Sequence, residues 1–253
     1  MHTSKEPRLL VKEAASLCLN CHKIDSQVIK AAHKNLTLEK ARCQTCHNPH
    51  ASDKTGLVVK FLHKPFGDGN CAGCHDMKNQ NPSATLKMGS DLCFMCHHQW
   101  KENLMKAVVH YPVGKGECLP CHLPHGSEEA FLLVKTEREM CLNCHLKIKE
   151  QINSSKFNHP IKAGGGKCTA CHVPHSAPEK YLFPAGSIEV CAICHKNQGS
   201  FSHPVGPKAI DPRSSDGKGF VTCVSCHDPH GTQYEFILRL QKDSELCIQC
   251  HKK

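Results

Sequence analysis

Residues 118–145 read CLPCHLPHGSEEAFLLVKTEREMCLNCH, and this stretch contains the pattern that decides the fold. It opens with a Cys-x-x-Cys-His motif that Pro124 and His125 follow, and the apolar tag FLLVK then leads into a second motif. Similar arrangements return along the chain, so that all 20 cysteines of the 253 residues belong to ten such motifs. The motifs therefore account for every thiol in the chain.

Each motif combines two cysteines with a histidine that follows the second one directly. The cysteines are Cys18 and Cys21, Cys43 and Cys46, Cys71 and Cys74, Cys93 and Cys96, Cys118 and Cys121, Cys141 and Cys144, Cys168 and Cys171, Cys191 and Cys194, Cys223 and Cys226, and Cys247 and Cys250. The adjacent histidines are His22, His47, His75, His97, His122, His145, His172, His195, His227 and His251.

This motif is the attachment signature of c-type haem. The two thiols form thioethers to the porphyrin, and the histidine becomes the proximal ligand of the iron. Residues i, i+3 and i+4 of a helical turn share one face, so the spacing presents both sulfurs and the imidazole to one side of a flat macrocycle. We therefore expect ten covalently attached haem c groups.

Other uses of paired cysteines are zinc ribbons, iron–sulfur clusters and disulfide frameworks. None of these requires a histidine after the second cysteine. Histidine occupies 21 of the 253 positions, so its presence after all ten pairs is no coincidence. The pattern favours haem over a structural metal or disulfides.

The composition also indicates that something other than side chains fills the interior. Hydrophobic residues make up 39 % of the chain and aromatic residues only 5 %, too little for a large conventional core. Haem would supply the missing apolar surface. The formal charge of +9 would then balance the negative charge of the haem propionates, so it does not indicate nucleic-acid binding.

Eleven further histidines remain, and most of them occupy two recurring positions. Four follow a motif in the form CHxPH, namely His50, His125, His175 and His230. Four begin an H-P or H-x-P step ahead of a motif, namely His63, His110, His159 and His203. The other three are His2, His33 and His98.

These signals define a repeat of about 50 residues that carries two motifs. Residues 63–109, 110–158, 159–202 and 203–253 are predicted to be two-haem modules, 23–62 a single-haem module and 1–22 a half module with one haem. The first module of the four departs from the others because Lys78 stands where they have the histidine of CHxPH. A methionine or lysine ligand, or an open iron, is one interpretation of this module, with Met77 and Met88 nearby; haem packing is the ordinary role of these methionines.

The pattern resembles the doubled Cys-x-x-Cys-His modules of multihaem c-type cytochromes, including decahaem conduits of metal-reducing bacteria. The resemblance implies six-coordinate iron with a second, distal histidine. Omitting His98, which adjoins a proximal histidine and is expected to be exposed, leaves ten distal candidates for ten irons: His2, His33, His50, His63, His110, His125, His159, His175, His203 and His230. Which of them serves which iron stays open.

The expected fold is mostly irregular with short α-helices, an elongated modular array with little or no β-sheet. Helical turns are expected at the motifs, with short helices over 26–34 and 101–109. Residues 204–219 lengthen one module and are expected to form a solvated loop, or else a partner site. Residues 2–12 parallel 125–135, so the chain is expected either to be a fragment of a longer repeat protein or to use His2 as a distal ligand.

Electron transfer is the function that six-coordinate haems favour. A multihaem reductase with one open iron in the 63–109 module is the alternative, and a structural metal protein is a third. Because haem c is attached outside the cytoplasmic membrane, we expect an extracytoplasmic protein. We expect redox proteins or extracellular acceptors as partners, with an outer-membrane porin or a homopolymeric filament as forms of assembly. No apolar run is long enough for a membrane helix.

Overall fold

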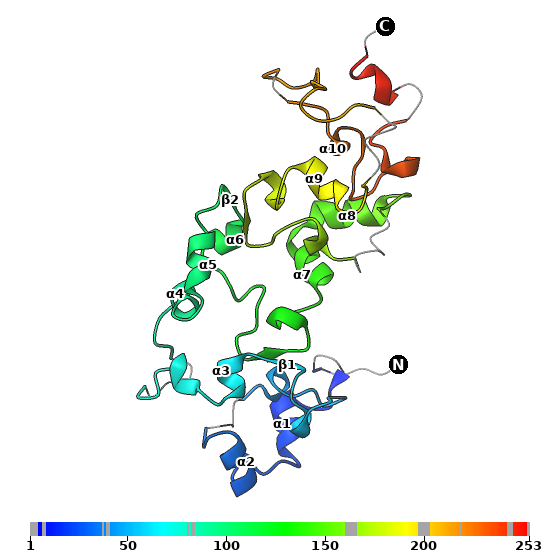
Figure 1. Cartoon of the computed structure of the whole chain (residues 1–253). Coiled ribbons are helices and arrows are strands. Elements are labelled where there is room, and N and C mark those ends of the chain that lie inside the picture. The colour runs from blue at the N-terminus through cyan, green and yellow to red at the C-terminus, as the bar shows by residue number, and fades with distance from the viewer. Residues whose placement is uncertain are drawn as a thin grey trace. The chain divides into compact units, whose positions relative to one another are not determined.

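A computed structural model describes residues 5–6, 9–36, 38, 41–79, 81, 84–159, 166–196, 203–217, 219–241 and 245–251. Short helices separated by irregular connections dominate these residues, as Figure 1 shows. The α-helices are α1 (Ala14–Leu19), α2 (Gln27–Ala32), α3 (Lys64–Gly67), α4 (Ser90–Phe94), α5 (His98–Asn103), α6 (Tyr111–Gly114), α7 (Glu137–Cys144), α8 (Leu146–Ser154), α9 (Ser187–Ala192) and α10 (Cys223–Cys226). The prediction of a mostly irregular fold with short helices and little sheet is confirmed.

Short 3-10 turns complete the local structure and recur at fixed places in the repeat. Those at cysteine motifs are η2 (Cys43–Thr45), η4 (Cys71–Gly73) and η7 (Cys168–Ala170). Those in the apolar tags are η3 (Thr55–Leu57), η5 (Ala130–Leu132), η8 (Lys180–Leu182) and η9 (Glu235–Ile237).

One of the two predicted helices agrees with the structure and the other does not. The helix expected over 26–34 is α2, which Ser26 caps by accepting a hydrogen bond from the Ile29 N–H at 3.4 Å. The helix expected over 101–109 is wrong, because α5 begins at His98 and ends at Asn103. Val108–Val109 instead form strand β2, since pairing with a distant segment determines their conformation.

Two small antiparallel sheets connect consecutive modules. Strand β1 (Phe61–Leu62) pairs with β3 (Gly126–Ser127), and β2 (Val108–Val109) pairs with β4 (Ser176–Ala177). A bridge between Phe157 and Thr232 repeats the arrangement, with N–H···O distances of 2.9 and 2.8 Å. In each case the residues just before the H-(x)-P step of one module pair with those just after the CHxPH of the following module. The pairing therefore docks each module on the one before it.

The chain divides into two compact units. The first unit comprises Met1–Met95 with Cys118–Thr136, and the second comprises Cys96–Glu117 with Glu137–Lys253. The module boundaries predicted from the repeat cross this division and stay a prediction.

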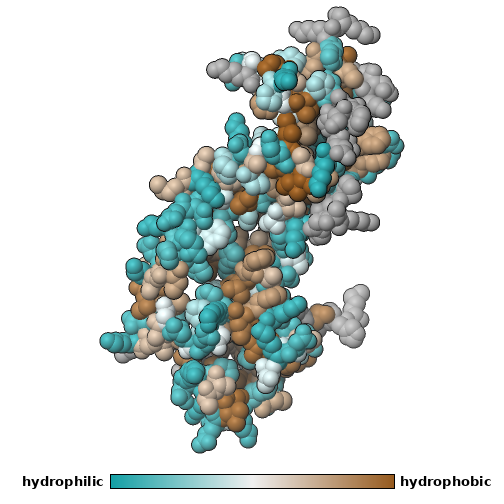
Figure 2. Space-filling view, in the orientation of Figure 1, coloured by the Kyte–Doolittle hydropathy of each residue, from teal (hydrophilic) through white to brown (hydrophobic). Residues whose placement is uncertain are grey.

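The polypeptide buries few of its own apolar side chains. Among the described residues the buried apolar side chains are Val59, Ala177, Val190, Val221 and Leu238. The accessible surface is 19065 Å², whereas a compact protein of 28.0 kDa exposes about 11,000 Å². Apolar residues lie among polar ones on the face shown in Figure 2. Side-chain packing alone therefore does not hold this chain together.

The segment expected to be a solvated loop is a loop in which most of the described residues are exposed, and it is also folded back on the motif that follows it. The backbone N–H of Gly206 donates to Val221 at 2.8 Å, and the N–H of Asp211 donates to Gly219 at 2.9 Å. The Arg213 guanidinium donates to Asp211 Oδ2 at 2.7 Å and to Gln249 Oε1 at 2.9 Å. The guanidinium thus links the segment to the last cysteine motif. Its hydrogen bond to Asp211 also holds the pKa of that carboxyl well below its usual range.

Within the described part of the chain, no helix combines the length and the apolarity that crossing a membrane requires.

Gly126 offers a test of the pairing between modules. A Cβ at this position would lie 2.8 Å from a Val59 methyl and 2.9 Å from the Phe61 carbonyl oxygen, so Gly126→Ala should force β1 and β3 apart. We expect a loss of about 1–3 kcal/mol in unfolding free energy, seen as a lower denaturation midpoint by circular dichroism. Gly67→Ala is the matched control, because its Cβ would meet Leu62 at an ordinary 3.6 Å. Equal midpoints for the two variants would contradict the close packing.

Candidate haem sites

Nine of the ten motifs show the same backbone turn, in which the histidine N–H donates to the carbonyl of the first cysteine. The nine N···O distances are 2.9 to 3.0 Å, from His22 to Cys18 at the first motif through His251 to Cys247 at the last. This i to i−4 bond closes one helical turn. Both sulfurs and the imidazole therefore leave the same face of the backbone, as the spacing predicts.

The backbone at the motifs is either α-helical or a 3-10 turn. Cys93, Cys141 and Cys191, each the first cysteine of a second motif, lie on the helices α4, α7 and α9. Cys71 and Cys168, which open first motifs, begin 3-10 turns, whereas Cys223, which also opens a first motif, begins the helix α10. The Cys18 motif lies on α1. The interpretation of residues 1–22 as the second half of a module stays a prediction.

A carbonyl oxygen nine residues further along fixes the ring of each first-motif proximal histidine. The Nδ1–H of His47 donates to the carbonyl oxygen of Gly56 at 2.6 Å, and other modules have equivalent bonds with the same nine-residue spacing. They run from His122 to Phe131 at 3.0 Å, from His172 to Tyr181 at 2.6 Å, from His227 to Phe236 at 2.8 Å and from His75 to Ala84 at 3.3 Å. Donation from Nδ1 leaves Nε2 as the nitrogen with a lone pair for a metal.

A strained turn places this carbonyl. Phe131 and Leu132 have φ values of 58°, in the left-handed region, and Tyr181–Leu182 and Phe236–Ile237 share the conformation. Two successive non-glycine residues in this region are costly, of order 1–3 kcal/mol each, and such strain is typical of functional sites. In the sequence the apolar tag indicated only a repeat, and this role was not predicted. The constant nine-residue spacing from histidine to tag was the signal that could have revealed it.

Six proximal histidines face a histidine from the predicted distal set at nearly constant separation. The ring centroids lie 5.9 to 6.1 Å apart, and both members of every pair belong to the same unit. The pairs are His33 with His47, His125 with His75, His110 with His145, His159 with His195, His230 with His172, and His203 with His251.

This separation fits two imidazoles on opposite sides of one metal ion. A metal–imidazole bond is about 2 Å long, so ring centres about 1 Å beyond each nitrogen would be about 6 Å apart. Each pair provides two protein ligands, which suits an iron whose other four positions belong to a porphyrin. A zinc site made of protein alone needs about four ligands, and the described residues contain no group of three or more His, Cys, Asp or Glu placed to hold an ion.

The surroundings of four distal candidates favour the neutral form of the imidazole. Burial lowers the pKa of His110, His125, His159 and His230, and in every case the facing proximal histidine lowers it further. The neutral imidazole is the form that binds a metal.

Cysteines of consecutive motifs lie beside one another. A hydrogen bond with Cys141 lowers the pKa of Cys168 to about 7, whereas burial, with a contribution from Cys223, raises the pKa of Cys191 to about 12. In the second unit the neighbouring thiols form a series in chain order: Cys141 with Cys168, Cys171 with Cys194, Cys191 with Cys223, and Cys226 with Cys250. In the first unit Cys18 adjoins Cys43, and Cys93 adjoins Cys118. In these six pairs, consecutive attachment sites are adjacent in space within one unit.

All the ligand assignments stay predictions, for the six pairs and for the histidines outside them. His2 lies outside the described residues. His98 begins α5 and is exposed, as predicted. The other predicted ligands outside the six pairs are the proximal His22, His97, His122 and His227 and the distal candidates His50, His63 and His175.

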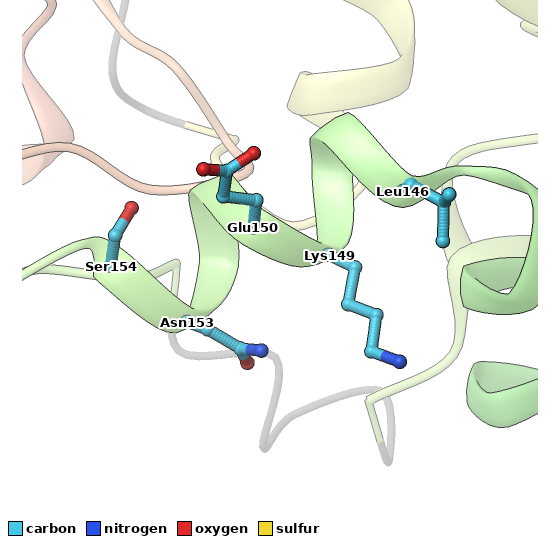
Figure 3. Close-up of a pocket in the computed structure, with 5 residues that line it drawn as sticks. All are labelled: Leu146, Lys149, Glu150, Asn153 and Ser154. Atoms are coloured by element: carbon cyan, nitrogen blue, oxygen red, sulfur yellow. The ribbon is translucent and has the colours of Figure 1, made fainter.

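A pocket along α8 is separate from these sites. Leu146, Lys149, Glu150, Asn153 and Ser154 line it, all from one helix. Figure 3 shows Lys149 and Glu150 leaving the helix in different directions, so the polar groups do not converge. Neither a cysteine nor a histidine is among the residues that line it.

Comparison with known proteins places the motifs in a family. The family model of the doubled CXXCH motif matches four times, at residues 63–102, 110–150, 158–200 and 215–253. These ranges contain eight of the ten motifs, and the motifs at 18–22 and 43–47 lie outside them.

The chain is also similar to the multiheme cytochrome MtrA of Shewanella baltica, with 29 % identity over 244 residues. The alignment covers 94 % of this chain and 53 % of that protein, so the chain spans about half the length of its relative. With its Cys-x-x-Cys-His turns and its four matches to the model, the chain belongs to the doubled CXXCH family and is a multihaem c-type cytochrome.

Proposed function

We propose that this chain binds ten haems, each held by two cysteines and two axial histidines, and that it carries electrons without transforming a substrate. The observation that carries the proposal is the set of six histidine pairs with centroids 5.9 to 6.1 Å apart. Two axial imidazoles leave no position on an iron for a substrate. Bound haem iron supplies reversible one-electron chemistry.

The two motifs outside the family matches support the count of ten. The His22 and His47 N–H groups close the same turn on Cys18 and Cys43 as the other motifs do. His47 also has the Nδ1 bond to the carbonyl of Gly56 and a facing histidine, His33. Its surroundings are therefore those of the matched motifs.

The series of neighbouring cysteines supports a path for electrons within the second unit. Sites at His145, His172, His195, His227 and His251 follow one another through adjacent cysteines in chain order. Transfer between successive sites needs short separations, which adjacent attachment points provide. The chain's part is to fix these separations and to exclude substrates from the irons.

The second candidate function is a reductase with one open iron in the 63–109 module. The absence of a CHxPH histidine at Lys78 favours it. However, His75 of this module faces His125 at 5.9 Å, which provides a second ligand at the first motif. Carbon monoxide distinguishes the two functions, because it binds reduced haem only where an axial position is open. The carrier predicts negligible binding by the native protein, and stoichiometric binding would establish the reductase.

We further propose an extracytoplasmic location, since haem c is attached there, and redox proteins or extracellular acceptors as partners. Similarity to a multiheme cytochrome supports a role in electron transfer, and we propose a respiratory or extracellular route for it. An outer-membrane porin and a homopolymeric filament are the two assemblies that electron microscopy of native material would tell apart.

The haem count has a direct measurement. We expect the intact mass of the native protein to exceed the polypeptide mass by ten haems, with every motif modified in tryptic peptides. An excess of eight haems, with residues 18–22 and 43–47 unmodified, would limit binding to the motifs in the family matches.

The pairing of His230 with His172 predicts the effect of removing one ligand. His230→Ala should convert one haem in ten from low-spin to high-spin, visible in electron paramagnetic resonance, and should create one carbon monoxide site per molecule. His98→Ala is the control, because its exposed ring belongs to none of the six pairs, and it should leave all spectra unchanged. A fully low-spin His230→Ala protein would refute the assignment.

A further inference from the structure

We propose that His33 is the axial ligand of the haem at His47, where it replaces a histidine that the repeat would supply from position 78. This inference rests on the proposed haem binding and names a ligand that the repeat pattern alone does not assign. His33 is neither part of a CHxPH nor followed by proline.

The described histidine pairs follow two rules, which depend on where each histidine lies in its module. The histidine of an H-(x)-P step faces the second proximal histidine of its own module, as the pairs that begin at His110, His159 and His203 show. The histidine of a CHxPH faces the first proximal histidine of the preceding module, as His125 and His230 show. A histidine can thus face a proximal histidine of its own module or one of the preceding module.

The backward ligand reaches its target through the pairing between modules. The His63 N–H donates to the His125 carbonyl at 2.9 Å beside the β1–β3 pair, and His63 Nδ1–H donates to the Pro124 carbonyl at 2.9 Å. The His110 N–H donates to His175 at 3.0 Å beside β2 and β4. Each CHxPH is therefore held by its backbone against the module that precedes it.

The module at 23–62 is the exception to these rules. Its one proximal histidine is His47, and the next module has Lys78 where a backward ligand is due. The backbone there is nevertheless that of a CHxPH turn. The Lys78 N–H lies 3.1 Å from Asp76 Oδ1, and the His230 N–H lies 3.1 Å from Asp228 Oδ1. Position 78 therefore has the backbone of a CHxPH histidine but the side chain of a lysine.

His33 is placed to fill this position. His33 directly follows α2 and lies ten residues before Cys43, close to where other modules have their H-(x)-P histidine. In those modules this histidine faces the second motif, but the module of His33 has only one motif. Its Nδ1–H donates to the Ile29 carbonyl at 2.9 Å, while His47 Nδ1–H donates to Gly56. Nε2 is thus the nitrogen left for a metal in both rings, whose centroids lie 5.9 Å apart.

Removing His33 tests the assignment. His33→Ala should keep ten haems by mass, convert one of them to high-spin and create one carbon monoxide site per reduced molecule. His98→Ala again serves as the control. In a Cys43→Ser, Cys46→Ser background, which lacks the haem at His47, His33→Ala should add neither signal. A low-spin His33→Ala protein, or a carbon monoxide site that persists in that background, would overturn the proposal.

A graft tests the link to position 78. Lys78→His added to His33→Ala should return the haem to low-spin and abolish carbon monoxide binding, because the Asx turn at Asp76 already has the required form. A haem that stays open would show that His33 does not replace a ligand from position 78. Ten haems with low-spin spectra in the unmodified protein would leave the proposed function intact even then.

Discussion

In six places two imidazole rings stand 5.9 to 6.1 Å apart, the separation that one metal ion between them would require, and much of this chain is arranged to produce it. The Cys-x-x-Cys-His turn sets one ring, and a left-handed turn nine residues later fixes its rotation through a carbonyl oxygen. The second ring comes from elsewhere in the sequence. Its position depends on the fold of its own module in four pairs and on how one module docks on another in the two pairs that involve His125 and His230.

This requirement explains how a chain with so few buried side chains has a defined structure. Val59 and Leu238 are among the handful of buried apolar residues, and the sheets are two residues long in each strand. Such pairs are too short for independent stability. We infer that coordination provides what a hydrophobic core provides elsewhere, since a ligand from one module that binds the iron of another ties their backbones together. Strain at Phe131 or Tyr181 is tolerable in such a framework.

Prediction from the sequence succeeded where short-range geometry decides. Spacing within each motif dictates a helical turn, and nine of the turns have the expected backbone bond. Ser26 marks the start of α2 because its hydroxyl can accept a backbone N–H. Prediction failed at 101–109, where Val108 and Val109 pair with residues about 68 positions away. At 204–219 the expected loop is present, but its link to the last motif, where Arg213 reaches Gln249, was not predicted.

The amino-acid sequence by itself determined the class of the protein and predicted the attachment cysteines and the proximal histidines, because these depend on residues three or four positions apart. It also supplied a pool of distal candidates without partners assigned to them. Only the tertiary structure decided that His125 faces His75 and that His33 faces His47. The physical reason is that the second ring approaches from another segment, so its partner depends on how the chain folds within a module and pairs between modules, which no local spacing encodes.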